Sequence, residues 1–491
     1  MKEKLKKIVN IDFFAICIFF IILLSNVFYV GFGAVDELWN FSNIYKMCNG
    51  YTIYKDLNVI ITPLFFYLGE VIFKLIGPNY LSFRIYNLVI YFALLYLIYN
   101  IFKTLKIEKI SSIMYTLIIY MFVYITIRAG ANYNCLAILL YLLGVFIVLK
   151  LDKNKWFLPY LQGVIAFIIL ITKQNIGVYY LIAYFIMQIF IAYNNKNIKK
   201  EIIIFVKQII TFIILSIIFL IVLILNDNLD NFVNICILGI SEFTSNNIAV
   251  AIPAITMLSV VGISIVVSII LIKLKNIDNE VKINNIKMLP FVIMCIPIAF
   301  PIFNRYHVYL LSILGVILLI YNLHILIVKE IIGKKIIRKI YIIMIIIITI
   351  YYAIFLILNN IKYYKNLDTY INPYYGSMIS NEQIDNINNI CNFIKENEQE
   401  GIDVKIISYT SNLYMNVLNK NNGILDLPFY GNLGKDGEQG IINIISSMDN
   451  VKILIQKDDE LFFQESEKVR NYIKQNLKYE GEIEDFLIYS K

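Results

Sequence analysis

The sequence has few of the residues that build metal centres and disulfide frameworks. It contains two histidines and six cysteines in 491 residues, and no two cysteines have the Cys-x-x-Cys spacing of a zinc or redox site. Charged residues make up 16% of the chain and hydrophobic residues 59%, which excludes a soluble globular protein of ordinary composition. The net charge is +8. The lysines cluster in short segments between apolar runs, so a nucleic-acid partner is not expected.

What the sequence has instead is a series of long apolar runs, from the N-terminus to about residue 358. About 20 apolar residues are enough to cross the hydrocarbon core of a bilayer, and about eleven runs approach or exceed that length. We therefore predict a polytopic α-helical membrane protein. The predicted spans lie near residues 11–30, 80–102, 110–128, 132–149, 157–172, 175–193, 202–225, 249–272, 288–303, 307–328 and 340–358.

The basic residues indicate how the predicted spans are oriented. Lysine clusters precede the first span and then recur at every second loop, whereas the intervening loops contain few basic residues. Because positively charged loops stay in the cytoplasm, this alternation places the N-terminus there. We expect a multi-pass protein of the cell membrane, with the first loop (31–79) and everything after about residue 359 facing outward.

The composition becomes polar and charged after Tyr363, which marks a second domain. We predict a membrane domain at 1–362 and an extracytoplasmic α/β domain at 363–491. In the α/β domain, apolar spacing predicts helices and alternating strands. The helices are expected at 382–398, 440–448 and 464–477, and the strands at 404–409, 451–455 and 486–489. Two further helices, at 39–47 and 63–76 in the first loop, are expected to lie in the headgroup plane.

An acidic pair, Asp36-Glu37, directly follows the first predicted span. It is followed in order by Gly50-Tyr51-x-x-Tyr54-x-Asp56, Thr62-Pro63-Leu64, Tyr67, Phe73-Lys74-Leu75-Ile76-Gly77 and Arg84. This order resembles bacterial membrane glycosyltransferases of the protein O-mannosyltransferase-like group. These enzymes belong to the GT-C superfamily, which also includes the lipid A aminoarabinose transferases. The resemblance covers about residues 11–105, with weaker similarity at Lys173-Gln174 and at 301–307.

The resemblance implies that a sugar is transferred from a polyprenyl-phosphate carrier to an envelope acceptor on the outer face. An acceptor hydroxyl is a poor nucleophile, so a carboxylate must take its proton, and Asp36 is the candidate base. Glu37 would orient the acceptor or share a divalent metal, which is the one cofactor left open. A phosphate leaving group needs cations, and the candidates are Arg84, Lys173, Arg305 and His307. The sequence departs from many relatives before the second helix of the first loop, where they carry a lysine or histidine and two prolines and this chain has Ile61-Thr62-Pro63-Leu64.

Each of these residues also has a structural interpretation. Arg84 could extend to lipid headgroups, Lys173 could belong to a tight turn, and Glu37 could be a solvated loop carboxylate. Two other functions also remain open for the whole protein. One is a transporter or flippase of lipid-linked sugars, and the other is a non-catalytic envelope scaffold. The sugar is open, and the acceptor could be a glycan, a lipid or a protein.

Overall fold

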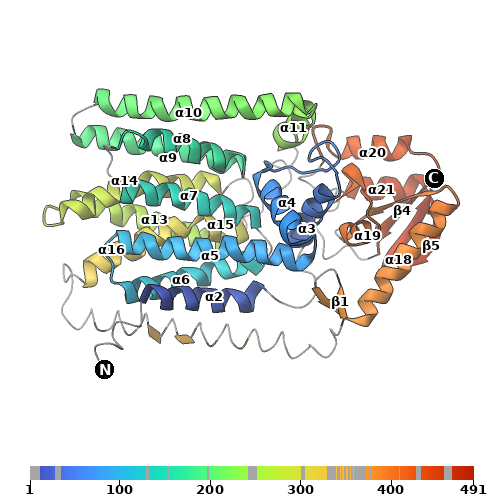
Figure 1. Cartoon of the computed structure of the whole chain (residues 1–491), viewed down its shortest axis with the longest axis horizontal. Helices are drawn as coiled ribbons and strands as arrows, with labels where there is room; N and C mark the ends of the chain where they lie inside the picture. Colours follow the sequence, from blue (N-terminus) through green and yellow to red (C-terminus); the bar gives the residue numbers. More distant parts are fainter. Residues whose placement is uncertain are drawn as a thin grey trace. The chain divides into compact units, whose positions relative to one another are not determined.

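The structure is a computed structural model of the chain, and it consists mostly of helices with a small sheet near the C-terminus (Figure 1). Its contacts group the chain into two units. We call residues 1–29, 87–218 and 249–364 the helical unit, and residues 30–86, 219–248 and 365–491 the mixed unit. The structure describes residues 11–27, 35–128, 132–151, 155–195, 198–240, 252–299, 303, 305–328, 372–374, 377–408, 410–426, 433–457 and 467–491, with single residues between 339 and 358.

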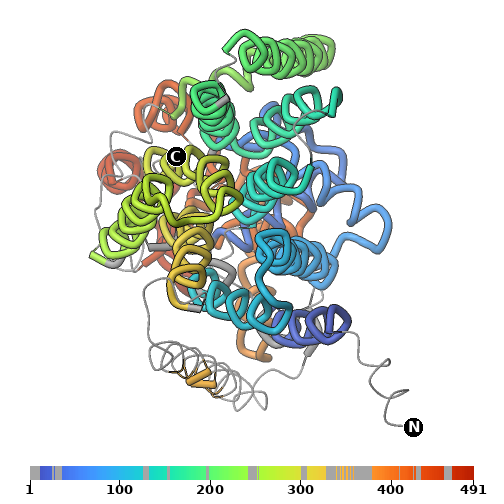
Figure 2. Tube along the Cα trace, turned by 90° about the vertical axis from the view of Figure 1, so that its left-hand side faces the viewer, coloured from blue at the N-terminus to red at the C-terminus, as the bar shows by residue number. Residues whose placement is uncertain are grey.

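The helical unit is a bundle of apolar helices, which Figure 2 shows nearly end-on. Its members are α2 (Ile11–Val27), most of α5 (Tyr80–Thr104), α6 (Lys109–Arg128), α7 (Asn132–Lys150), α8 (Leu158–Leu170), α9 (Gln174–Asn195), most of α10 (Ile198–Leu225), α13 (Ile252–Lys273), α14 (Asn279–Ile298), α15 (Arg305–Leu311) and α16 (Ile313–Val328). Helix α14 packs against α9, α13 and α16.

Six of the described helices, namely α5, α7, α9, α10, α13 and α14, are long and apolar enough to cross a membrane. Helix α10 exposes apolar side chains along most of its length, including Ile202, Val206 and Ile210. A surface of this kind requires an apolar environment, so the helices indicate association with a membrane. The number of about eleven spans stays a prediction, and most of the last predicted span, 340–358, lies outside the described residues.

Polar side chains join some of these helices inside the bundle. The amide nitrogen of Asn322 in α16 donates to Asn285 Oδ1 in α14 and to Ser268 Oγ in α13, at 2.9 Å each. The Tyr115 hydroxyl lies 2.9 Å from His324 Nδ1. All five residues are buried. In an apolar environment such bonds favour one packing of the helices over others.

The N-terminal part of the mixed unit is a pair of helices, α3 (Val35–Cys48) and α4 (Leu64–Ile76). Both correspond to helices predicted in the first loop, and their place in the headgroup plane stays a prediction. They approach closely because Gly69 of α4 faces Ile44 of α3. A Cβ atom at Gly69 would lie only 2.4 Å from Ile44 Cδ1. Phe41 packs against the rings of Phe73 and Tyr80, at centroid distances of 5.8 and 4.9 Å, which fixes α3 against α4 and the start of α5.

The C-terminal part of the mixed unit is a four-stranded sheet between two layers of helices. The strands are β3 (Asp403–Ile407), β4 (Val451–Gln456), β5 (Lys478–Ile483) and β6 (Phe486–Ser490), in the order β3-β4-β6-β5. Strands β3 and β4 are parallel, and the other neighbours are antiparallel. Helices α18 (Asn381–Gln399) and α19 (Ser411–Val417) cover one face, and α20 (Gly437–Ser447) and α21 (Glu467–Asn476) cover the other.

The predicted α/β character of this region is confirmed. Helix α18 begins where its sequence predicts, because Ser380 and Gln383 form a capping box in which each side chain bonds the other's backbone N–H. The elements that were not predicted include α19, β5 and the short hairpin of β1 (Asn372–Tyr374) and β2 (Ser377–Ile379). The predicted domain boundary at 362/363 stays a prediction.

The third part of the mixed unit, residues 219–248, supports the loop between α3 and α4. It contains the short helix α11 (Leu229–Phe232) and a π-helical turn, η1 (Val233–Leu238). Asn228 donates to the carbonyl of Ile53 at 2.7 Å, and the Cys236 thiol lies 3.4 Å from the carbonyl of Val59. Two segments that are far apart in sequence therefore satisfy each other's polar groups.

Candidate functional site

The predicted base and its neighbour lie in the first turn of α3. Asp36 is half-buried and Glu37 is buried, with 5% of its surface exposed. Two carboxylates at this end of a helix are favourable, because the unpaired backbone N–H groups there carry a partial positive charge. The chain therefore gains stability from placing acidic residues where the predicted chemistry needs them.

The structure brings Arg84 to Glu37. Arg84 lies near the start of α5, is only 3% exposed, and has its Nε 3.5 Å from Glu37 Oε1. Its guanidinium carbon also lies 4.8 Å from the centre of the Tyr80 ring, a cation–π distance. Arg84 is thus a buried, positioned cation, which does not fit a side chain extended into lipid headgroups. Glu37 faces this cation, which does not fit a solvated loop carboxylate.

The other three predicted donor-site residues belong to the helical unit. Lys173 lies between α8 and α9, and its ammonium group contacts Asn134 Oδ1 at 2.5 Å. An electrostatic interaction links Lys173 to His307 in α15. Arg305 is the first residue of the same helix, and its side chain lies outside the part that the structure describes. That these residues share one site with Asp36 and Arg84 stays a prediction.

A second buried ion pair on α3 was not found from the sequence. Lys46, in the last turn of α3, contacts the carboxylate of Asp426. Both side chains are buried, at 1% and 6% exposure. Lys46 Nζ also lies 3.2 Å from the side-chain oxygens of Asn412 and of Asn421. A buried ammonium group is tolerated only when its hydrogen bonds are satisfied in this way.

Further polar contacts extend this cluster between α3 and α19. Ser42, one turn before Lys46, has its Oγ 2.8 Å from Asn412 Oδ1 and 2.9 Å from Asn416 Oδ1. Ser411 in turn donates to Asp426 at 3.2 Å. The one signal in the sequence is the spacing of Ser42 and Lys46, which places two polar residues on one face of an otherwise largely apolar helix. Nothing in the sequence reveals their partners.

Among the residues that the structure describes, no three His, Cys, Asp or Glu side chains gather as a metal site would require. A divalent metal shared by Asp36 and Glu37 therefore stays a prediction. Comparisons with protein families, with curated proteins and with solved structures found no match.

Proposed function

We propose that the protein is a glycosyltransferase of the GT-C type. It would transfer a sugar from a polyprenyl-phosphate donor to an envelope acceptor on the outer face of the membrane, with inversion at the sugar. The observation that carries the proposal is the first turn of α3, where Asp36 precedes a carboxylate that faces the buried Arg84 at 3.5 Å. The base, Asp36, is thus adjacent in sequence to one carboxylate, Glu37, and the cation Arg84 is close to it in space.

Each residue then has a distinct role. Asp36 accepts the proton of the acceptor hydroxyl as that oxygen attacks the anomeric carbon, and the bond from that carbon to the phosphate oxygen breaks with its electrons on the phosphate. Arg84 stabilises the negative charge of the leaving phosphate, and the same role for Lys173, Arg305 and His307 stays a prediction from the sequence. Glu37 is the residue that orients Arg84. A single displacement of this kind needs one base, whereas glycosidases use two carboxyl groups.

The test is transfer of a radiolabelled sugar from polyprenyl phosphate by the purified protein in lipid nanodiscs. Asp36→Asn keeps the size of the side chain and removes its ability to accept a proton. We expect transfer to fall by about two to four orders of magnitude, which is the usual contribution of a general base. Asp385→Asn, which changes an exposed carboxylate on α18, is the matched control and should leave transfer unchanged. Wild-type turnover by Asp36→Asn would show that the base lies elsewhere.

A transporter of lipid-linked sugars is supported by one observation, the buried polar row of Ser268, Asn285 and Asn322 within the bundle. Polar groups inside a membrane bundle often mark a substrate path. The same nanodisc protein can be reconstituted into liposomes to separate the two functions. Movement of a labelled lipid-linked sugar to the other leaflet, without transfer to any acceptor, would favour the transporter.

The proposed orientation can be tested with single-cysteine variants and a membrane-impermeant maleimide applied to intact cells. Lys478→Cys, at an exposed residue of β5, should be labelled if the C-terminal sheet faces outward. Lys275→Cys, in the loop after α13, should be labelled only after permeabilisation, because positively charged loops are retained in the cytoplasm. The reverse pattern would place the chemistry in the cytoplasm.

A further inference from the structure

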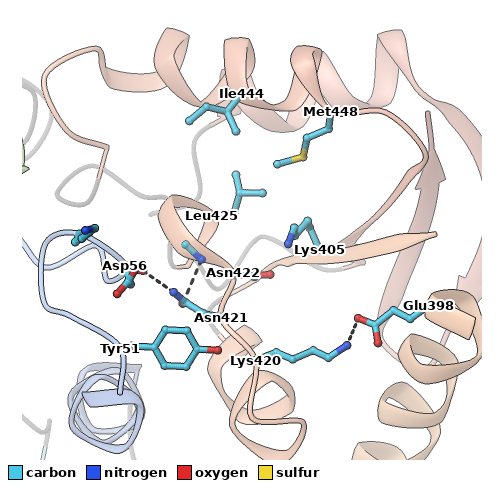
Figure 3. Close-up of a pocket in the computed structure, with 12 residues that line it drawn as sticks. Tyr51, Asp56, Glu398, Lys405, Lys420, Asn421, Asn422, Leu425, Ile444 and Met448 are labelled. Atoms are coloured by element: carbon cyan, nitrogen blue, oxygen red, sulfur yellow. Dashed lines mark hydrogen bonds and ion pairs between the residues drawn. The ribbon is translucent and has the colours of Figure 1, made fainter. Parts of the chain in front are cut away.

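The mixed unit contains an open cavity of about 640 Å³. Its walls come from the loop at residues 51–56, from strand β3, from the segment after α19, and from α20 (Figure 3). A volume of this size is typical of cavities that hold a small ligand. Within this unit, the cavity is therefore a candidate binding site that is separate from the first turn of α3.

Three lysines from three different segments line this cavity: Lys55, Lys405 and Lys420. Lys55 is exposed, and the side chains of Lys405 and Lys420 are 21% and 35% exposed. Lys405 pairs at 3.0 Å with Asp403, which does not line the cavity. Lys420 pairs with Glu398, which itself lines the cavity. In Figure 3 the side chain of Lys405 points between Asn422 and Met448.

The other polar groups of the lining are mostly occupied by the protein itself. Asp56 accepts the backbone N–H of Thr52 at 2.7 Å, and Asn421 donates to the carbonyl of Asp56. Asn422 bonds both the N–H and the carbonyl of Ile406. An anion in the cavity would meet the exposed ammonium group of Lys55 and would compete with Asp403 and Glu398 for those of Lys405 and Lys420.

The remaining lining is apolar and forms one wall. Leu425, Ile444 and Met448 lie above Lys405 and Lys420 in Figure 3, and the Tyr51 ring lies at the opposite side, level with Lys420. Carbon-rich surface of a ligand would bury against these side chains. A free inorganic anion would leave this wall unused, whereas an anionic group carried on a sugar or polyol chain would contact both parts.

We propose that this cavity binds the acceptor of the transfer reaction, and that the acceptor is a glycan or polyol chain bearing phosphate or carboxylate groups. This inference rests on the proposed function, whose acceptor it specifies. Lys420 is paired with Glu398, and burial together with the neighbouring charge of Lys395 lowers the pKa of its ammonium group.

The cavity is connected to α3 through Asn421. The side chain of this residue lines the cavity, accepts a hydrogen bond from Lys46 at 3.2 Å, and donates to the backbone of Asp56. Lys46 lies on the same helix as Asp36. A ligand that contacts Asn421 therefore touches the polar cluster that holds the helix of the candidate base.

The test is direct binding to the full chain in nanodiscs, measured by calorimetry with three chains of similar length. These are a short poly(glycerol phosphate), an oligogalacturonate and a neutral maltooligosaccharide. We expect at least one of the anionic chains to bind, the neutral chain not to bind, and binding to weaken as the ionic strength rises. The phosphate and carboxylate chains distinguish the two sources of negative charge.

Variants locate the binding. Lys405→Gln and Lys55→Gln should each weaken the affinity by about threefold to tenfold. Lys478→Gln, on exposed β5 away from the cavity, should leave it unchanged. Equal binding of the neutral chain, or loss of affinity with Lys478→Gln and not with Lys405→Gln, would overturn the inference. Transfer to a neutral acceptor with no anion binding would overturn the inference and leave the proposed function intact. Anion binding without any transfer would show an anion site in the cavity but would overturn the proposed function, and with it the assignment of the ligand as an acceptor.

Discussion

Helix α3 carries a buried ion pair at each end, and the two pairs are built differently. At its first turn, Arg84 lies 3.5 Å from Glu37 and packs over the Tyr80 ring. At its last turn, Lys46 contacts Asp426 and lies 3.2 Å from two amide oxygens. A distance of 3.5 Å is longer than an ordinary N–H···O bond. The contact between Lys46 and Asp426 is therefore closer than that between Arg84 and Glu37.

This difference indicates that the two ends of α3 have different roles. A buried charge pair with satisfied hydrogen bonds specifies one arrangement, because any displacement would leave a charge unpaired in an apolar environment. At 3.5 Å, the contact between Arg84 and Glu37 is one with which an arriving anion can compete. We therefore expect the Lys46 end to determine where α3 lies, and the Glu37 end to contribute to the reaction.

The largest expected effect on stability is that of Lys46→Met. Removing the ammonium group leaves the buried carboxylate of Asp426 without its counter-charge, which costs about 3–5 kcal/mol. Hydrogen exchange at the amides of α19 should accelerate by about two to three orders of magnitude, since exchange there requires local opening. The measurement is hydrogen exchange followed by mass spectrometry on the protein in nanodiscs.

Two controls make this result specific. Lys74→Met, on the adjacent α4, removes an exposed lysine that pairs with Glu70, and it should leave exchange in α19 unchanged. The double variant Lys46→Met/Asp426→Leu removes both charges together. Replacing a buried pair by apolar side chains is often neutral, so the double variant should recover most of the protection. If the double variant exchanges as fast as Lys46→Met, the contribution of the Lys46–Asp426 pair to stability is not limited to the neutralisation of its two charges.

A smaller effect, on turnover, is expected at the other end of the helix. Arg84→Ala removes a cation from the proposed donor site, and a hydrogen bond to a charged group contributes about 1.5–3 kcal/mol. Transfer should therefore fall by about ten- to a hundredfold, with weaker binding of the lipid donor. Arg84→Lys should restore activity only in part, because an ammonium group cannot form the two parallel bonds of a guanidinium. Normal donor binding by Arg84→Ala would show that Arg84 is not part of the donor site.

The smallest expected effect is a change in the reactivity of Cys48, the last residue of α3. Burial, with the nearby Glu70, raises the pKa of this thiol to about 11. Because the thiolate is the reactive form, alkylation should be slow at pH 8 and should accelerate as the pH rises toward 11. Lys46→Met should increase the rate at pH 8 a few-fold by loosening this end of the helix, whereas Arg84→Ala should not. Peptide-resolved mass spectrometry of the alkylated protein reports the rate for this cysteine alone.

The local elements with strong apolar spacing were predictable from the sequence. The helix α18 and the strands β4 and β6 lie within a few residues of their predicted positions. Strand β5 was missed because Lys478–Ile483 is largely exposed and has no alternating apolar pattern. Helix α19 was missed because Ser411–Val417 is short and rich in polar residues whose partners lie on α3. Its burial depends on tertiary contacts, which local patterns do not encode.

Of the candidate site, too, only the part formed by residues close in sequence was predictable. The acidic pair is visible in sequence, because residues adjacent in the chain remain adjacent in the first turn of a helix. The approach of Arg84 to Glu37 is a tertiary contact. The resemblance in motif order indicated both residues as candidates for the site but not that they lie together. The Lys46 cluster had no sequence signal for its partners, since Asp426 lies 380 residues away.

That separation also has a consequence for synthesis. A ribosome adds about 5–20 residues each second, so roughly 20 to 75 s pass between the appearance of Lys46 and that of Asp426. During this time most of the apolar helices are already made, but α3 lacks its counter-charge. Helix α3 therefore acquires this ion pair only after Asp426 has been translated. A nascent chain that stops before this residue would contain the acidic pair on a helix whose last turn still lacks its counter-charge.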